Sequence, residues 1–90
     1  MEDEYREIVR KFYEIYRPLQ KKHNLRYHMH FDISDDGLIE IWEYEEKKKK
    51  KCISIVREEK DIDCYKKAIE DLEHYRRDRE ENEYERKAAV

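Results

Sequence analysis

The stretch from Arg26 to Glu58 most constrains the fold, because apolar and polar side chains alternate along it. Three segments share this period of two: RYHMHFDI, LIEIWEYE and KCISIVRE. Such alternation is typical of strands with one buried face. The segments are separated by the sequence Ser34 to Gly37 and by the lysine run Lys47 to Lys51, which mark two turns. The stretch therefore predicts three antiparallel strands joined by two hairpins.

Amphipathic helices are predicted on both sides of these strands. Over residues 2–16 apolar residues recur at spacings of three and four, and a similar stripe follows the third strand. Pro18 cannot donate a backbone hydrogen bond, so the first helix is expected to end or kink there, with Asn24 stopping a further short turn. Asp61 or Asp63 can cap the second helix. The inner stripe of that helix is expected to comprise Ile62, Tyr65, Ala68, Ile69, Leu72 and Tyr75.

The order of these elements defines the expected fold class. We predict an α+β fold of two layers, helix–three-stranded antiparallel sheet–helix, with both helices on one face of the sheet. A chain of 90 residues suits one small domain. We assign it to residues 1–75 and interpret residues 76–90, which are mostly charged, as a helical extension or a frayed tail.

Composition restricts the class of protein further. Cys52 and Cys64 have neither the spacing of a zinc motif nor that of a disulfide scaffold. No apolar run approaches the length of a membrane span. We therefore expect a reduced, cytoplasmic protein that has no cofactor and does not associate with membranes.

The turn at Gly37 decides which side chains of the second strand are buried. A glycine in the left-handed conformation would make a three-residue loop with a bulge. This loop would pair Ser34 with Leu38. Ile39 and Ile41 would then face the helices.

The bulged turn also places two aromatic side chains on the outer face, the side of the sheet away from the helices. Trp42 and Tyr44 would lie there opposite His30 and His28. A loop of two or four residues would shift the register by one and bury both rings. We favour the bulged turn because it buries the two isoleucines of the second strand. For the third strand we expect an inner row of Ile53 and Ile55 and an outer row of Cys52, Ser54 and Val56.

Two surfaces are candidates for binding a protein partner. Exposed Trp and Tyr beside Arg are typical of interface hot spots, and the outer face would carry Arg26, His28, His30, Trp42 and Tyr44. The start of the last helix is acidic and would attract a basic partner; its residues are Asp61, Asp63, Glu70 and Asp71. We therefore predict a non-enzymatic interaction module that binds a basic protein partner. The module is expected to be a monomer or a homodimer.

Nucleic acid is the alternative partner. Five adjacent lysines would form the tip of the second hairpin, and two more lie in the last helix. Such a positive spot can contact phosphates, or its lysines can simply prevent sheet edges from aggregating. The residues concerned are Lys47, Lys48, Lys49, Lys50, Lys51, Lys66 and Lys67.

The first strand carries the candidate residues for metal binding and catalysis. His28, His30 and Asp32 would share one face, and two imidazoles with a carboxylate can hold zinc or iron. However, alternate strand residues lie about 7 Å apart, so a shared metal would need splayed side chains and another ligand. His28 could also pair with Glu43 or Tyr44 as an acid–base dyad, but a domain of this size offers little cleft. We expect neither a metal site nor an active site.

Two resemblances bear on function. The helix–three strands–helix order resembles the double-stranded-RNA-binding domain, and Tyr65-Lys66-Lys67-Ala68 matches the paired lysine with which that family grips phosphates. This resemblance implies an RNA- or DNA-binding module. The family's alanine-rich continuation is acidic here, at residues 69–73, and its glycine-proline-histidine loop is replaced by residues 34–37.

The second resemblance is to phage-encoded inhibitors of host nucleases, the anti-CRISPR proteins among them. It rests on the same order of elements, the small size and the acidic balance of the chain, which has a net charge of −3. Such inhibitors often block a basic nucleic-acid channel with acidic side chains. The resemblance implies a regulator or inhibitor of a nucleic-acid-handling protein, which is our first expectation.

Overall fold

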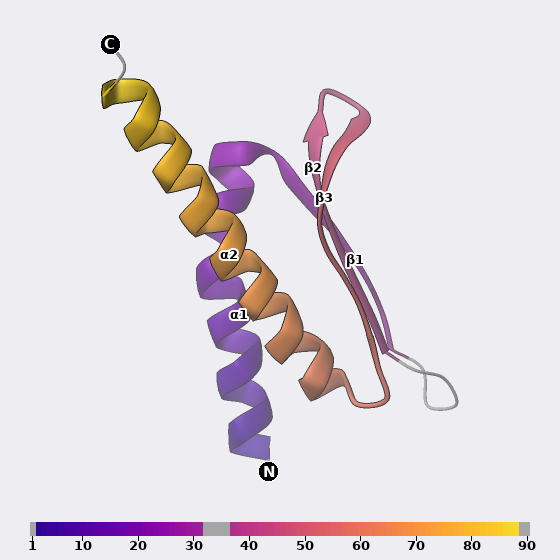
Figure 1. The fold of residues 1–90 in the computed structure, drawn as a ribbon. Coiled ribbons are helices and arrows are strands. Elements are labelled where there is room, and N and C mark those ends of the chain that lie inside the picture. Colours follow the sequence, from indigo (N-terminus) through magenta and orange to yellow (C-terminus); the bar gives the residue numbers. More distant parts are fainter. Residues whose placement is uncertain (1, 32–36, 89–90) are drawn as a thin grey trace.

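The computed structural model describes residues 2–31 and 37–88, and the side chains of residues 3–31 and 37–82. Its elements are α1 (Glu2–His23), β1 (Leu25–His30), β2 (Gly37–Glu45), β3 (Lys48–Glu58) and α2 (Asp61–Ala88). The strands form one antiparallel sheet in the order β1-β2-β3. Both helices lie on the same side of this sheet (Figure 1). The chain therefore has the α+β fold predicted from its sequence.

α1 continues through Pro18 and ends at His23, so an end at the proline is wrong. Asn24 stops the helix instead, with a left-handed φ of 55° that asparagine tolerates better than most residues. The Tyr44 backbone N–H donates to the Asn24 carbonyl at 3.0 Å, and the Asn24 amide donates to the Tyr44 carbonyl at 3.1 Å. These bonds fix the end of α1 to β2 and start β1 in register.

The hydrophobic core fills the space between the helices and the inner face of the sheet, the face that they cover. The predicted stripe of α2 is buried except for Ile62, which is half-buried, and Cys64 joins it. Neither described helix carries an apolar run long enough to cross a membrane. The buried apolar residues are Phe12, Tyr16, Leu19, Leu25, Ile39, Ile41, Val56, Cys64, Tyr65, Ala68, Ile69, Leu72 and Tyr75.

The pairing of β1 with β2 differs from the predicted register by four residues. Leu38 lies opposite His30 rather than Ser34, and Trp42 lies opposite Arg26 rather than His30. Because the shift is an even number, every side chain keeps its predicted face. The two isoleucines of β2 are buried, and its two aromatic residues are on the outer face, as predicted.

Gly37 is needed for a different reason from the one predicted. Its φ is not positive, so the left-handed bulge is wrong. Gly37 is instead the first residue of β2, and an added Cβ would lie 2.8 Å from Phe31 Cδ1 and 3.0 Å from Cys64 Sγ. The ring and the thiol leave no room for a side chain. The rest of the predicted turn, residues 34–36, lies outside the described residues.

The second hairpin turns earlier than the lysine run suggests. Glu45 pairs with Lys48, so the loop consists of Glu46 and Lys47 alone. Glu46 has a φ of 58°, the sign that a two-residue hairpin loop requires at its first position. The prediction of a five-lysine tip is therefore wrong, because residues 48–51 belong to β3.

In β3, Ser54, Ile55 and Val56 lie on the faces opposite to those predicted. Val56 and Ser54 pair with the buried isoleucines of β2 and are themselves buried. Ile55, predicted to face inward, is 55% exposed on the outer face. The register shifts twice between β2 and β3, and one shift makes Ile53 an extra residue that is partly buried against the core. Ser54 is accommodated inside because its hydroxyl donates to Asp71 at 2.7 Å.

Candidate binding surface

The outer face of the sheet carries no helix among the described elements (Figure 1). Directly opposed residues of an antiparallel sheet share a face, so the pairing defines which side chains gather there. They form four rows, His30–Leu38–Arg57, His28–Glu40–Ile55, Arg26–Trp42–Cys52 and Tyr44–Lys49. The sheet therefore brings all five residues predicted for this face onto one surface.

Cations from the flanking strands cover the two aromatic rings at its centre. The guanidinium carbon of Arg26 lies 4.6 Å from the ring centroid of Tyr44. On the other side, Lys49 Nζ lies 4.7 Å from the ring centroid of Trp42. Such contacts stabilise exposed pairs by about 0.5–1 kcal/mol. They hold the aromatic side chains in place before any partner arrives.

Glu40 is the one carboxylate among the described strand residues of this surface, and its charge is already paired. The Trp42 indole N–H donates to Glu40 Oε1 at 2.6 Å, and Lys49 Nζ lies 3.7 Å from the same oxygen. Glu40, Trp42 and Lys49 thus form one connected group across β2 and β3. A depression of about 260 Å³ opens between this group and Arg26.

The two histidines of β1 lie at the edge of the outer face, and Asp32 lies outside the described residues. In the described part of the chain, no three His, Cys, Asp or Glu side chains come together as metal ligands. His28 lies opposite Glu40, whereas Glu43 points to the other side of the sheet. The dyad of His28 with Glu43 is therefore wrong.

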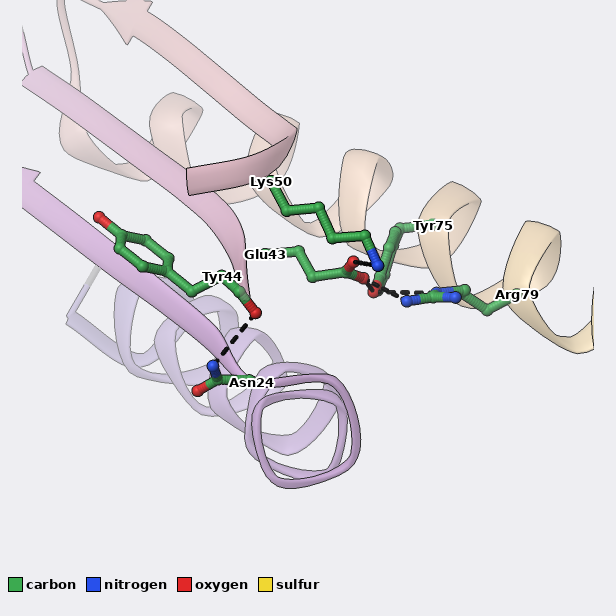
Figure 2. A network of polar contacts seen from close by, with 6 residues as sticks. All are labelled: Asn24, Glu43, Tyr44, Lys50, Tyr75 and Arg79. Carbon is green, nitrogen blue, oxygen red and sulfur yellow. Dashed lines mark hydrogen bonds and ion pairs between the residues drawn. The ribbon is translucent and has the colours of Figure 1, made fainter. Parts of the chain in front are cut away.

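A buried polar network on the inner face was missed by sequence reasoning. Glu43 is 3% exposed, and both the Tyr75 hydroxyl and the Arg79 guanidinium donate hydrogen bonds to its Oε1 (Figure 2). Lys50 Nζ lies 3.7 Å from its other oxygen, and Arg79 Nε donates to the Tyr75 hydroxyl at 3.2 Å. Figure 2 shows Glu43 and Tyr44 pointing to opposite sides of β2. The network joins β2, β3 and α2.

The protonation states of this network follow from its geometry. Burial alone would raise the pKa of Glu43, but hydrogen bonds from Tyr75 and Arg79, with the charges of Arg79 and Lys50, lower it overall. Burial and the hydrogen bond to Glu43 raise the pKa of Tyr75 to about 12. At neutral pH the pair is a carboxylate that accepts from a phenol. Its position inside the fold indicates a structural role.

The predicted acidic surface of α2 is divided among internal contacts. Asp71 accepts the hydrogen bond from Ser54 of the sheet, and Glu70 Oε2 lies 3.3 Å from Lys67 Nζ. Asp61 accepts from the next backbone N–H at 2.9 Å, at the start of the helix. Asp63, the fourth acid of this predicted surface, is exposed. These residues do not form a single free patch.

The lysines of the alternative site are also dispersed. Lys50 contacts Glu43, and Lys51 Nζ lies 5.8 Å from the Tyr75 ring centroid on the inner side. Lys66 Nζ lies 3.4 Å from Glu4. Tyr75, the α2 residue beside Lys51, lies nine residues after Lys66, roughly 13 Å along the helix. The structure therefore does not bring the hairpin lysines and the α2 lysines together.

No family of known proteins, no characterised protein and no solved structure matches this chain.

Proposed function

We propose that this protein is a non-enzymatic interaction module that binds a partner protein through the outer face of its sheet. The observation that supports the proposal is the half-buried aromatic pair Trp42 and Tyr44, which lies on the face without a described helix and is held by a cation from each flanking strand. Trp, Tyr and Arg are the residues that most often dominate binding energy at interfaces. An isoleucine that is 55% exposed, Ile55, adds apolar area to the same face.

Regulation or inhibition of a nucleic-acid-handling protein is the role that we propose for this binding, in the cytoplasm. It rests on the resemblance in size, order of elements and acidic balance to phage-encoded nuclease inhibitors. The expectation of a basic partner belongs to the acidic start of α2, where Asp63 and Glu70 remain exposed. Because Asp61, Glu70 and Asp71 make internal contacts, the outer face is the better-supported site.

A variant of the outer face tests the proposal. Trp42→Ala/Tyr44→Ala removes both rings, and Tyr5→Ala is a matched control because Tyr5 is an aromatic residue of α1, 36% exposed. Each immobilised chain is incubated with an extract of the source organism, and retained proteins are quantified by mass spectrometry. We expect a protein that wild type and control retain and that the double variant loses. Identical retention by all three chains would contradict the proposal, provided that circular dichroism shows the same fold.

Nucleic-acid binding is the second candidate, and one observation favours it: Lys49 lies beside Trp42 on the outer face. Aromatic rings with adjacent cations can stack on unpaired bases. Binding through four or five phosphates should weaken by orders of magnitude as salt rises from about 50 to 200 mM. A gel-shift series with generic RNA and DNA checks this, and the absence of any shift at low salt would remove the candidate.

A further inference from the structure

The strand residues that the structure describes on the outer face carry a charge of opposite sign to that of the whole chain. The chain has a net charge of −3. Among the described residues of this face are three cations, Arg26, Lys49 and Arg57, and one carboxylate, Glu40. That carboxylate is already bonded to Trp42 and lies beside Lys49. In this described part of the sheet the cations therefore outnumber the carboxylate beside the half-buried Trp42 and Tyr44.

Two of these cations lie on either side of the two aromatic residues at the centre of the face. Arg26 of β1 and Lys49 of β3 both line the depression, with Trp42 and Tyr44 of β2 between them. At about 260 Å³ it is smaller than most sites for cofactors and drug-sized ligands. It suits side chains of a partner better than a small-molecule ligand. Lys49 remains half exposed and can donate to a new acceptor.

We propose that the outer face binds an acidic segment of the partner protein that also carries apolar side chains. Arg26 and Lys49 receive carboxylates of the segment, and Trp42 and Ile55 provide the apolar contact. Arginine and lysine pair with carboxylates through charge-assisted hydrogen bonds. Complementary charge also speeds association and disfavours basic partners. This inference rests on the proposed function and adds the chemistry of the partner.

An acidic protein segment fits these observations better than a nucleic acid does. A base that stacks on Trp42 or Tyr44 must compete with the cation that already covers one side of the ring. A bound strand also needs a row of cations along its backbone. Lys50 and Lys51, the next cations along β3, instead contact groups on the inner side of the sheet. Carboxylates need only the two cations at the depression.

Selection from a random dodecapeptide library displayed on phage tests this inference. The full chain is immobilised as wild type, as Arg26→Glu/Lys49→Glu, as Trp42→Ala, and as Arg10→Glu. Arg10 is the matched control, because its exposed guanidinium lies on α1, away from the sheet. We expect wild type and the control to select peptides rich in Asp and Glu with interspersed apolar residues. The affinity of a selected peptide, measured by fluorescence anisotropy, should fall by roughly tenfold or more in the charge-reversed variant.

The outcomes separate this inference from the proposed function. If the selected peptides are neutral or basic but are lost in Trp42→Ala, the acidic partner is overturned and the outer-face site is supported. If peptide binding is unchanged in Trp42→Ala, both are overturned. If no peptide is enriched, the face does not take a linear segment and the inference is wrong. Arg26→Ala/Lys49→Ala replaces the charge-reversed chain if circular dichroism shows that the latter is unfolded.

An oligonucleotide arm uses the same anisotropy measurement. Labelled (dT)12 and (rU)12 are titrated with wild type and with Arg26→Glu/Lys49→Glu at low salt. We expect weaker binding than that of the selected peptide. Tighter oligonucleotide binding that the charge-reversed variant loses would assign the face to single-stranded nucleic acid and overturn the inference.

Discussion

Each face of the sheet contains a carboxylate on β2, but the two carboxylates are satisfied in different ways. On the inner face Glu43 takes its donors from Tyr75 and Arg79, more than thirty residues later in the chain. On the outer face Glu40 takes its donor from Trp42, two residues away. Inner contacts therefore hold the helix layer to the sheet, whereas outer contacts stay within the sheet. Because the outer contacts do not reach the helices, we expect that the outer face can change without loss of the fold.

The largest difference in stability between the two faces is expected for variants of two isoleucines. Ile41 of β2 is fully buried, whereas Ile55 of β3 is 55% exposed on the outer face. Ile41→Ala should lower the free energy of unfolding by about 2–5 kcal/mol, because it leaves a cavity among packed side chains. Ile55→Ala should cost about 0.5 kcal/mol or less. Urea denaturation of both variants checks this, and equal losses would show that the two faces are not distinct.

The same two residues show how far the sequence predicts the fold. Alternation along β1 and β2 is sufficient to predict which face of each strand is buried, because each strand has one clearly apolar row. In β3 both rows contain apolar residues, so hydrophobicity favoured Ile53 and Ile55 for the core. The fold instead buries Ser54, because Asp71 accepts its hydroxyl, and this contact depends on tertiary structure. The two register shifts between β2 and β3 also interrupt the strict alternation of inner and outer side chains that the prediction assumes for β3.

Glu43→Gln tests the inner network next. The change keeps the volume of the side chain but removes the charge that Arg79 and Lys50 contact. Since the Arg79 side chain is 32% exposed, we expect a loss of about 1–3 kcal/mol rather than the larger cost of a fully buried pair. Glu40→Gln is the matched control on the outer face and should cost about 0.5 kcal/mol or less. A loss for the control as large as that for Glu43→Gln would contradict the contrast between the faces.

Acid should weaken the fold through the same carboxylate. The pKa of Glu43 is lower in the folded chain than its ordinary value of 4.5, so the unfolded chain binds the proton more tightly. The stability that this group contributes is fully present above pH 4.5 and is lost as pH falls through the lower, folded pKa. Urea midpoints measured from pH 7 to pH 3 should fall more steeply for wild type than for Glu43→Gln. Parallel curves would exclude Glu43 as a source of the acid sensitivity.

The sequence predicts the five residues of the candidate site but not the contacts that they make. Trp42 and Tyr44 reached the predicted face because the register error was even and left each side chain on its own side. Arg26 was predicted on this face, but the cation beside Trp42 was not, because the lysine run indicates a hairpin tip and only the short turn at Glu46 places Lys49 in β3. The inner network was missed for a similar reason. Arg79 lies in the stretch interpreted as a charged tail, and sequence spacing alone does not show that α2 brings it to Glu43.

Trp42→Ala should have a small effect on stability and a large effect on binding. Trp42 is half-buried, and the atoms that it contacts are exposed or half-exposed polar groups of the sheet. We expect a loss of about 1 kcal/mol, well below the 3–5 kcal/mol of a fully buried aromatic residue. Phe12→Ala is the matched control, because it removes a fully buried ring of α1, and it should lower the free energy of unfolding by more. A loss of about 3 kcal/mol or more for Trp42→Ala would make this residue part of the core. A small loss together with abolished partner binding would instead mean that the ring is held at the surface for recognition rather than for stability.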